Sequence, residues 1–206
     1  MSPRRSVAAT RDTHEAIVRR AMHVASVAGL EGVTIGRLAD DLGMSKAGVA
    51  GHFANKEQLQ LEAIGAAVAL FTARVADATR SARPGVERLL AGLDAWFSYL
   101  ERSPFPGGCV IEAAVAEQDG RPGPVRDAVA EAVGRWRAFL RGELERALEA
   151  GEIAPALEAE PLAFALQALG AGLNQAVQLR GDADAGRHAR VAAHALLGTS
   201  ASPPPA

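Results

Sequence analysis

The chain has 206 residues and a formal net charge of −2, with 49% hydrophobic and only 4% aromatic residues. This length allows one large or two small domains. The sequence has no run of about 18 uncharged apolar residues, which argues against a membrane-spanning helix. The single cysteine, Cys109, excludes an internal disulfide, and the N-terminal arginines precede no apolar stretch of a signal peptide. These features predict a cytoplasmic protein.

Helical patterns follow one another along the whole chain, and no stretch alternates convincingly with a period of two. Prolines and glycines punctuate the connections, where they break helices or begin them at the first helical position. The sequence therefore predicts an all-α fold of about nine helices. The predicted helices span residues 10–29, 35–42, 46–52, 56–81, 84–103, 107–118, 123–151, 158–180 and 184–198.

The charges are divided unevenly along the chain. Residues 1–56 carry eight Lys or Arg against five acids, whereas the rest carries fourteen Arg against nineteen acids. Both lysines of the chain, Lys46 and Lys56, lie in the basic part. A basic end on an acidic remainder is typical of a protein that meets phosphates with one face, although a chance distribution of surface charge is the alternative.

The most informative stretch is residues 34–59, TIGRLADDLGMSKAGVAGHFANKEQL. Thr34 and Ser45 are N-cap candidates for two short helices, because their side-chain oxygens can accept hydrogen bonds from N–H groups of the first turn. Gly43 ends the first helix, since glycine readily adopts the left-handed backbone of a helix C-terminus. Two short helices around such a turn predict a helix-turn-helix, whose second helix fits the DNA major groove.

This stretch resembles the DNA-binding domain of the tetracycline-repressor (TetR) family of bacterial regulators. Residues 105–129, FPGGCVIEAAVAEQDGRPGPVRDAV, also resemble the C-terminal domains of one subgroup of the family. The resemblance implies a helix-turn-helix domain over residues 1–56 and a helical ligand-binding and dimerisation domain over 57–199, while the Pro-rich residues 200–206 are predicted to be a disordered tail. The matching motif residues are Thr34, Leu38, Ala39, Gly43, Met44, Ser45, Val49, His52, Phe53, Lys56, Glu57 and Leu59.

By this resemblance, Thr34, His52 and Lys56 hold DNA phosphates, and residues 46–48 lie near base edges. Ordinary solvated polar residues are the alternative. The sequence departs from the family pattern at Ala50, where an aromatic residue is usual, and this departure predicts a sparse set of base contacts. The predicted DNA-binding residues are Thr34, Arg37, Ser45, Lys46, Ala47, Gly48, His52 and Lys56.

Most aromatic residues lie beyond the helix-turn-helix region. In the TetR family the corresponding helices enclose a pocket for a small, often hydrophobic molecule, and such pockets are mostly apolar with a few polar groups. The alternative is that these residues fill a core, and for Cys109 and Glu112 a satisfied or solvent-facing role. The predicted pocket residues are Phe71, Trp96, Phe97, Leu100, Cys109, Glu112, Trp136, Phe139, Leu140 and Phe164.

The last two predicted helices carry broad faces of apolar and small residues, which allow helix backbones to approach closely. Two such helices from each subunit would form a four-helix bundle between subunits, with the same patch used on both. The alternative is a core within one subunit. The predicted dimer residues are Leu162, Leu166, Leu169, Leu173, Val177, Val191 and Ala195.

The sequence matches none of the common motifs of enzymes. Gly170, Gly172 and Gln175 do not fit GxGxxG, no GxSxG or Walker-type loop occurs, and the five histidines are scattered. We therefore expect no enzymatic activity, no metal and no cofactor. The sequence predicts a homodimeric repressor that a small molecule releases from a near-palindromic DNA operator. The alternatives are a ligand-binding regulator with weak DNA affinity and a transcriptional activator.

Overall fold

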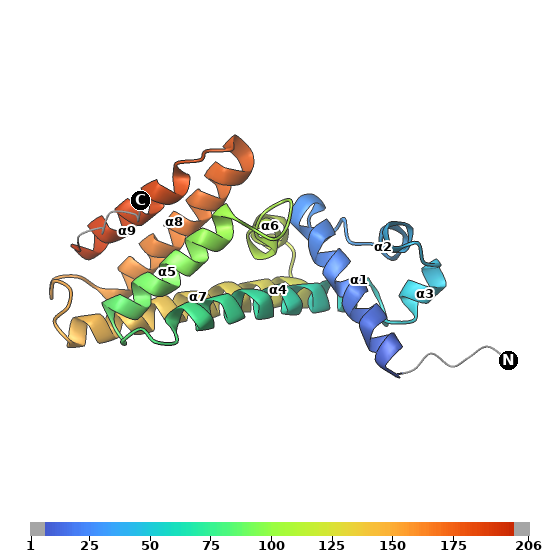
Figure 1. Cartoon of the computed structure of the whole chain (residues 1–206), viewed down its shortest axis with the longest axis horizontal. Helices are drawn as coiled ribbons and strands as arrows, with labels where there is room; N and C mark the ends of the chain where they lie inside the picture. Colours follow the sequence, from blue (N-terminus) through green and yellow to red (C-terminus); the bar gives the residue numbers. More distant parts are fainter. Residues whose placement is uncertain (1–6, 200–206) are drawn as a thin grey trace. The chain divides into compact units, whose positions relative to one another are not determined.

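The computed structural model describes residues 7–199, and within this range it contains nine α-helices and no strand (Figure 1). The prediction of an all-α fold is confirmed, and each predicted helix end lies within three residues of the observed one. The predicted tail, residues 200–206, lies outside the described residues. The helices are α1 (Val7–Ala28), α2 (Ile35–Leu42), α3 (Lys46–Ala50), α4 (Lys56–Thr79), α5 (Val86–Glu101), α6 (Val110–Gln118), α7 (Pro124–Glu149), α8 (Ala159–Arg180) and α9 (Ala185–Leu197).

The chain divides into two compact units. Unit 1 comprises the chain up to Ala69 together with residues 105–130, and unit 2 comprises residues 70–104 and the chain from Glu131 onward. The long helices α4 and α7 each contribute to both units. The predicted domain boundary after residue 56 differs from this division, because α6 packs against α1 and so belongs to unit 1.

Unit 1 is built around α1, which packs against α2 and α6, while α2 packs against α3 (Figure 1). An ion pair of 2.8 Å between Arg20 of α1 and Asp41 of α2 joins two of these helices at the surface. Apolar burial supplies the main packing energy, at roughly 25 cal/mol per Å² of buried apolar surface. The buried apolar residues include Ile17, Ala21, Leu30, Val33, Leu38, Val49, Leu59 and Ala63.

Unit 2 contains α5, α8 and α9, which pack against one another in pairs. Arg190 of α9 forms ion pairs with two carboxylates of α5: its Nε lies 2.7 Å from Asp94 Oδ1, and its Nη1 lies 2.9 Å from Glu101 Oε2. Its Nη2 also donates a hydrogen bond of 3.0 Å to Ser98 Oγ. Gly186 makes the approach possible, since a Cβ there would lie 1.7 Å from the Glu101 carboxylate. The polar contacts therefore fix α9 along α5.

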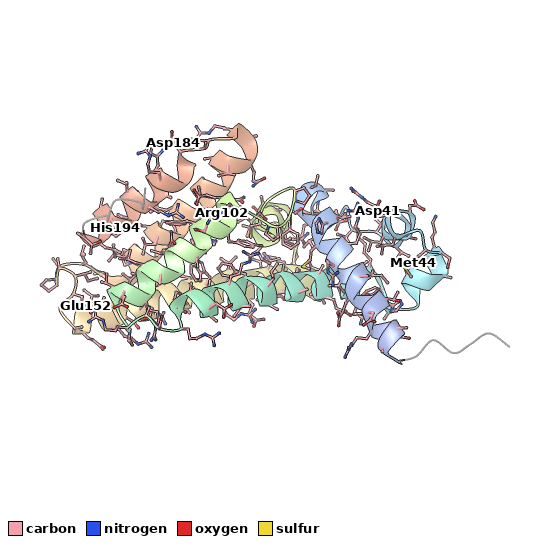
Figure 2. All side chains as sticks on the ribbon, viewed as in Figure 1. Asp41, Met44, Arg102, Glu152, Asp184 and His194 are labelled. Atoms are coloured by element: carbon pink, nitrogen blue, oxygen red, sulfur yellow. The ribbon has the colours of Figure 1, made fainter. Side chains whose placement is uncertain are left out.

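The start of α5 is capped from elsewhere in unit 2. The buried Glu143 of α7 accepts a hydrogen bond of 3.0 Å from the N–H of Gly85, and Glu152 accepts one of 2.8 Å from the N–H of Val86. Figure 2 shows Glu152 beyond the end of α7. These carboxylates satisfy amide groups that a helix N-terminus leaves without internal partners.

Helix α4 is long and apolar enough to cross a membrane by length and composition, with a mean hydropathy of 1.4. Helices in the core of helical proteins meet the same criterion. In this chain, Leu59, Ala63 and Ala67 of α4 are buried, and Gln60 donates a hydrogen bond of 2.7 Å to the backbone oxygen of Leu30. These residues of α4 therefore pack within the fold.

Candidate nucleic-acid interface

The turn between α2 and α3 has the geometry that its sequence predicts. Thr34 caps α2, because its Oγ1 accepts a hydrogen bond of 3.2 Å from the N–H of Arg37. Gly43 ends α2 in the left-handed conformation, with φ of 62°. The N–H of Met44, which Figure 2 places in this turn, then bonds to the oxygen of Ala39 at 2.9 Å. These contacts fix the direction in which α3 leaves α2.

Helix α3 is short, and its position is fixed by a cap and one buried side chain. Ser45 Oγ accepts a hydrogen bond of 3.0 Å from the N–H of Gly48. A Cβ on Gly48 would lie 3.1 Å from this oxygen, so glycine fits the cap without displacement. Val49 is fully buried, whereas Lys46, Ala47 and the rest of the outer side are exposed. The exposed side of α3 therefore consists of small residues and one charged side chain, Lys46.

The predicted DNA-binding residues are brought together on α2, α3 and the segment that follows. Arg37, Ser45 and Lys46 are exposed, and Gly48 and His52 are half-exposed. The stem of Lys46 passes over the first turn of α2, where a Cβ on Gly36 would lie 3.5 Å from Lys46 Cε. Arg37 and Lys46 thus lie on neighbouring elements and leave their charged ends toward solvent.

Lys56 differs from Lys46 because its ammonium group already has partners in the chain. Its Nζ lies 2.8 Å from Glu31 Oε2 and donates a hydrogen bond of 3.1 Å to the backbone oxygen of Glu31. The hydrogen bond from Lys56 lowers the pKa of Glu31, and the charges of Lys56 and Arg121 add to this effect. A DNA phosphate at Lys56 must therefore compete with Glu31.

The loop between α1 and α2 is held by α6. Glu117 of α6 accepts hydrogen bonds of 2.6 Å from the N–H of Leu30 and 2.7 Å from that of Glu31. The carboxylate occupies the space beside Gly29, where a Cβ would lie 2.5 Å from Glu117 Oε2 and the backbone has φ of 68°. Nearby, Gly107 approaches α1 so closely that its Cβ would lie 1.9 Å from the backbone oxygen of Ser26.

A second group of side chains lies beside the end of α3 and was not predicted from the sequence. The ring of His14 on α1 stacks on Phe53 with centroids 4.9 Å apart, and it lies 5.7 Å from the ring of His52. His14 Nε2 lies 2.6 Å from Glu62 Oε2 of α4. The contacts between His14, Glu62 and the end of α3 span up to 48 positions, so no local motif could have revealed them.

The predicted ligand-pocket residues are only partly brought together. In unit 2, the rings of Trp96 and Trp136 lie 5.2 Å apart, as do those of Phe71 and Trp136. Phe139 stacks on Trp136 with ring centroids 5.1 Å apart, and the ring of Tyr99, which is not among the predicted pocket residues, lies 5.7 Å from that of Phe71. We call this group the aromatic cluster; its members are Phe71, Trp96, Phe97, Tyr99, Trp136 and Phe139.

Two glycines make room for the aromatic cluster. A Cβ on Gly170 of α8 would lie 2.0 Å from the ring of Trp96, and one on Gly92 of α5 would lie 2.7 Å from that of Phe139. The indole Nε1 of Trp136 is buried and has no hydrogen-bond partner in the described part of the chain. A buried donor without a partner is unusual in proteins.

Other predicted pocket residues lie elsewhere. Leu100 and Leu140 are fully buried in the core. Phe164 is 60% exposed on α8, where Arg137 Cζ lies 5.4 Å from its ring centre, so it is not part of the aromatic cluster. Cys109 and Glu112 belong to unit 1, not to the unit of the aromatic cluster, and burial raises the pKa of Glu112.

The predicted dimer residues also divide into two groups. Leu162, Leu166 and Leu173 are buried within the single chain, where α8 packs against α5 and α9. The apolar stripe of α8 mainly serves its own core. Val191 and Ala195 of α9 are exposed, and Leu169 and Val177 are half-buried.

Comparison with known protein families gives two matches. Residues 17–63 match the model described as bacterial regulatory proteins of the tetR family, and residues 85–193 match the tetracyclin repressor-like C-terminal domain. No curated protein matches the chain. The two matched segments contain the α2–α3 turn and most of the helices of unit 2.

Solved structures agree with these matches. A TetR transcriptional regulator from Chloroflexus aurantiacus is 29% identical, with a TM-score of 0.83 over 92% of this chain and 96% of that chain. A putative transcriptional regulator from Saccharomonospora viridis in complex with choline is 21% identical, with a TM-score of 0.75 over 91% and 96% of the two chains. AibR in complex with isovaleryl coenzyme A and operator DNA is 20% identical, with a TM-score of 0.75 over 91% and 99%. With its capped helix-turn-helix and matched C-terminal domain, the chain belongs to the TetR family of DNA-binding transcriptional regulators.

Proposed function

We propose that this chain is a homodimeric cytoplasmic repressor, which a small molecule releases from a near-palindromic DNA operator. The observation that carries the proposal is the presentation of α3. Its caps and the buried Val49 fix the helix, while its outer side exposes Lys46 beside Arg37 of α2. A recognition helix of this kind enters the major groove, and a dimer places two of them about one helical turn of DNA apart.

The cap residues can serve DNA binding as well. Thr34 and Ser45 each use the hydroxyl oxygen to accept a backbone N–H, and this leaves the O–H free to donate to a phosphate. Phosphate contacts fix the position of a protein on DNA, whereas contacts to base edges select the sequence. Ala47, Gly48 and Ala50 offer little for hydrogen bonding to bases. We therefore assign most of the binding energy to phosphate contacts.

The dimer surface that we propose is the exposed side of α8 with the adjoining residues of α9. Phe164 is 60% exposed, Leu179 76% and Val191 51%, and small residues such as Ala168 and Ala171 lie exposed between them. Large apolar side chains exposed on one face are typical of a protein–protein interface. The same face on a second copy gives a two-fold symmetric contact.

The small molecule is proposed to bind at the aromatic cluster in unit 2. Tryptophan and tyrosine faces attract cations, and the unpaired indole N–H of Trp136 can donate to an acceptor on the ligand. Choline and isovaleryl coenzyme A, which are bound to two structural relatives, are therefore the first molecules to test. A coupling of about 1–3 kcal/mol between ligand and DNA would change occupancy roughly 5- to 150-fold.

DNA binding is tested with a labelled duplex from the region upstream of the gene, titrated at several salt concentrations. Removing one phosphate contact lowers the salt slope by about 0.9, so Lys46→Ala is expected to reduce both affinity and slope. Arg135→Ala is the matched control, because Arg135 is exposed on α7 and pairs with Glu131. An unchanged slope in Lys46→Ala would remove this lysine from the phosphate contacts, and absence of binding by the wild type would refute the proposal.

Lys56→Ala separates two roles of this residue. If Lys56 exchanges Glu31 for a phosphate, its variant lowers the salt slope as Lys46→Ala does. If Lys56 only stabilises the α1–α2 loop that contains Glu31, the variant changes the free energy of unfolding and leaves the salt slope unchanged.

The dimer is tested by light scattering at micromolar concentration. Phe164→Glu places a charge in the proposed interface and is expected to yield monomers, because an unpaired buried charge is strongly unfavourable. Val27→Glu is the matched control, since Val27 is 62% exposed on α1 in unit 1. A monomeric wild type, or a dimeric Phe164→Glu variant, would contradict the proposed surface.

A further inference from the structure

His14 on α1 lies outside the helix-turn-helix, yet its ring is fixed on two sides. One face stacks on the buried Phe53, with centroids 4.9 Å apart and an interplanar angle of 29°. The Nε2 atom lies 2.6 Å from Glu62 Oε2, and because a carboxylate only accepts, this nitrogen carries the proton in the contact. A ring fixed at its face and at its edge has lost most of its rotamer freedom.

Glu62 is itself fixed by Gln58 in the first turn of α4, which is bonded in turn to the segment that joins α3 to α4. Its Oε1 accepts a hydrogen bond of 2.9 Å from Gln58 Nε2, and Gln58 Oε1 accepts one of 2.6 Å from the N–H of Ala54. Asn55 completes the arrangement by accepting from the N–H of Gln58 at 2.8 Å. A continuous chain of hydrogen bonds therefore connects His14 with the backbone two residues after His52.

The third neighbour of His14 is His52, whose ring centre lies 5.7 Å away at an angle of 51°. His52 is half-exposed and directly follows Gly51, the C-cap of α3. Of the charged groups around this pair, Glu62 faces it from α4, while Arg11 and Glu15 on α1 pair with each other at 3.7 Å. The ring of His14 thus limits the positions that the ring of His52 can take.

We propose that His14 is a positioning residue for DNA binding: held by Glu62 and Phe53, its ring keeps the imidazole of His52 directed toward a DNA phosphate. This inference rests on the proposed function, since it assigns a role only in the complex with DNA. In this role, residues of α1 and α4 help to place a phosphate contact beside the recognition helix. A preformed contact binds more tightly because less side-chain entropy is lost on association.

The test uses a fluorescein-labelled duplex of random sequence, about 30 base pairs long, because phosphate contacts do not depend on sequence. Affinity is measured by fluorescence anisotropy at about 50 mM salt between pH 6 and 8, where imidazoles change charge. Loss of a charge-assisted hydrogen bond is worth about tenfold in affinity, so His52→Gln is expected to weaken binding by this factor per subunit and to flatten the pH profile. His14→Gln is expected to do the same.

The double variant His14→Gln/His52→Gln distinguishes positioning from an independent effect. If His14 acts through His52, the double variant binds no more weakly than His52→Gln alone. His23→Gln is the matched control, because His23 is another α1 histidine with an aromatic contact, at 5.4 Å to Phe105. It is expected to bind DNA like the wild type. Additive losses from His14→Gln and His52→Gln would overturn the inference.

Glu62→Ala provides a second route to the same question, should His14→Gln fail to fold. It removes the hydrogen bond that fixes His14 and leaves both histidines in place. We expect it to weaken DNA binding and flatten the pH profile in the same way as His14→Gln. If the wild type binds the duplex and Glu62→Ala binds equally well, the inference is wrong and the proposed function stands. If the wild type binds no duplex, both are wrong.

Discussion

The two compact units differ most at their candidate sites, although in both of them carboxylates accept hydrogen bonds from backbone amides. In unit 1, side chains from distant helices bond to backbone groups: Glu117 accepts from two successive amides of the α1–α2 loop, and Gln60 donates to the oxygen of Leu30. In unit 2, the proposed ligand site is the aromatic cluster, whose neighbouring ring centroids lie 5.1–5.8 Å apart. Buried polar atoms there, Trp136 Nε1 and Asn174 Oδ1, have no partner in the described chain.

The difference matters because the two kinds of interaction constrain atoms differently. Hydrogen bonds have narrow ranges of distance and angle, so they fix where the α1–α2 loop and the helices beside it lie. Apolar contacts depend mainly on buried area and tolerate several arrangements of similar volume. A surface that must match DNA benefits from the first kind, and the proposed small-molecule site would benefit from the second.

The largest expected effects come from the glycines that allow close approach in each unit. Gly107→Ala places a Cβ 1.9 Å from the backbone of Ser26, and Gly170→Ala places one 2.0 Å from Trp96. Both variants are expected to lose at least about 3 kcal/mol in the free energy of unfolding, measured by urea denaturation. Gly107→Ala should be the worse of the two, since the ring of Trp96 can shift more easily than a backbone carbonyl.

Gly134→Ala is the control for this comparison. Gly134 lies in α7, and its Cβ would meet nothing within 4 Å. Alanine there is expected to raise stability by about 0.5–1 kcal/mol, because it restricts the unfolded chain and favours the helix. If Gly107→Ala or Gly170→Ala were as stable as Gly134→Ala, the close approaches would not constrain the fold.

Glu117→Ala tests the polar side of the comparison. It leaves the N–H groups of Leu30 and Glu31 without their partner, and each lost bond to a charged group costs about 1–3 kcal/mol. We expect a loss of roughly 2–3 kcal/mol and faster hydrogen exchange at these two amides. Glu145→Ala, at an exposed position of α7 that pairs with Arg141, should change stability by less than about 0.5 kcal/mol. Unchanged exchange at Leu30 and Glu31 would contradict a fixed loop.

Trp136→Phe tests what the indole N–H contributes to the aromatic cluster of unit 2. It keeps an aromatic ring beside Trp96 and Phe139 but removes the unpaired indole N–H. Because that donor has no partner to lose, we expect stability within about 1 kcal/mol of the wild type, in contrast to a loss of about 3–5 kcal/mol for Trp136→Ala. Urea denaturation measures both. A large loss in Trp136→Phe would mean that the indole N–H makes a stabilising contact.

The smallest expected effect is the pH dependence contributed by Glu112. Burial raises the pKa of this carboxyl above its ordinary value of 4.5, so the folded chain keeps a proton that the unfolded chain has released. Stability from this group is therefore present at low pH and falls as the pH rises above about 4.5 and through the raised pKa. Glu112→Gln should lack this decline in thermal melts between pH 4 and 8, and an identical pH profile in the variant would refute the assignment.

The helices and the motif could be predicted because their causes are local. Gly43 and Gly181 end α2 and α8 in the left-handed conformation, and Thr34 and Ser45 cap α2 and α3, as their residue types indicate. Hydrophobic periodicity supplied the rest of the helical pattern. Hydrophobic periodicity does not distinguish a core within the chain from an interface between chains. The apolar stripe with Leu166 and Leu173 is buried within the chain.

Local patterns in the sequence are enough to predict the elements and the family: the helices, a turn at Gly43, and a motif whose spacing matches a helix-turn-helix. Which distant groups meet depends on how the helices pack. This packing pairs Lys56 with Glu31, joins His14 to Glu62, and binds Glu117 to the α1–α2 loop across 86 or more positions. Local rules act over a few residues, whereas these contacts depend on helix packing, which no short pattern encodes.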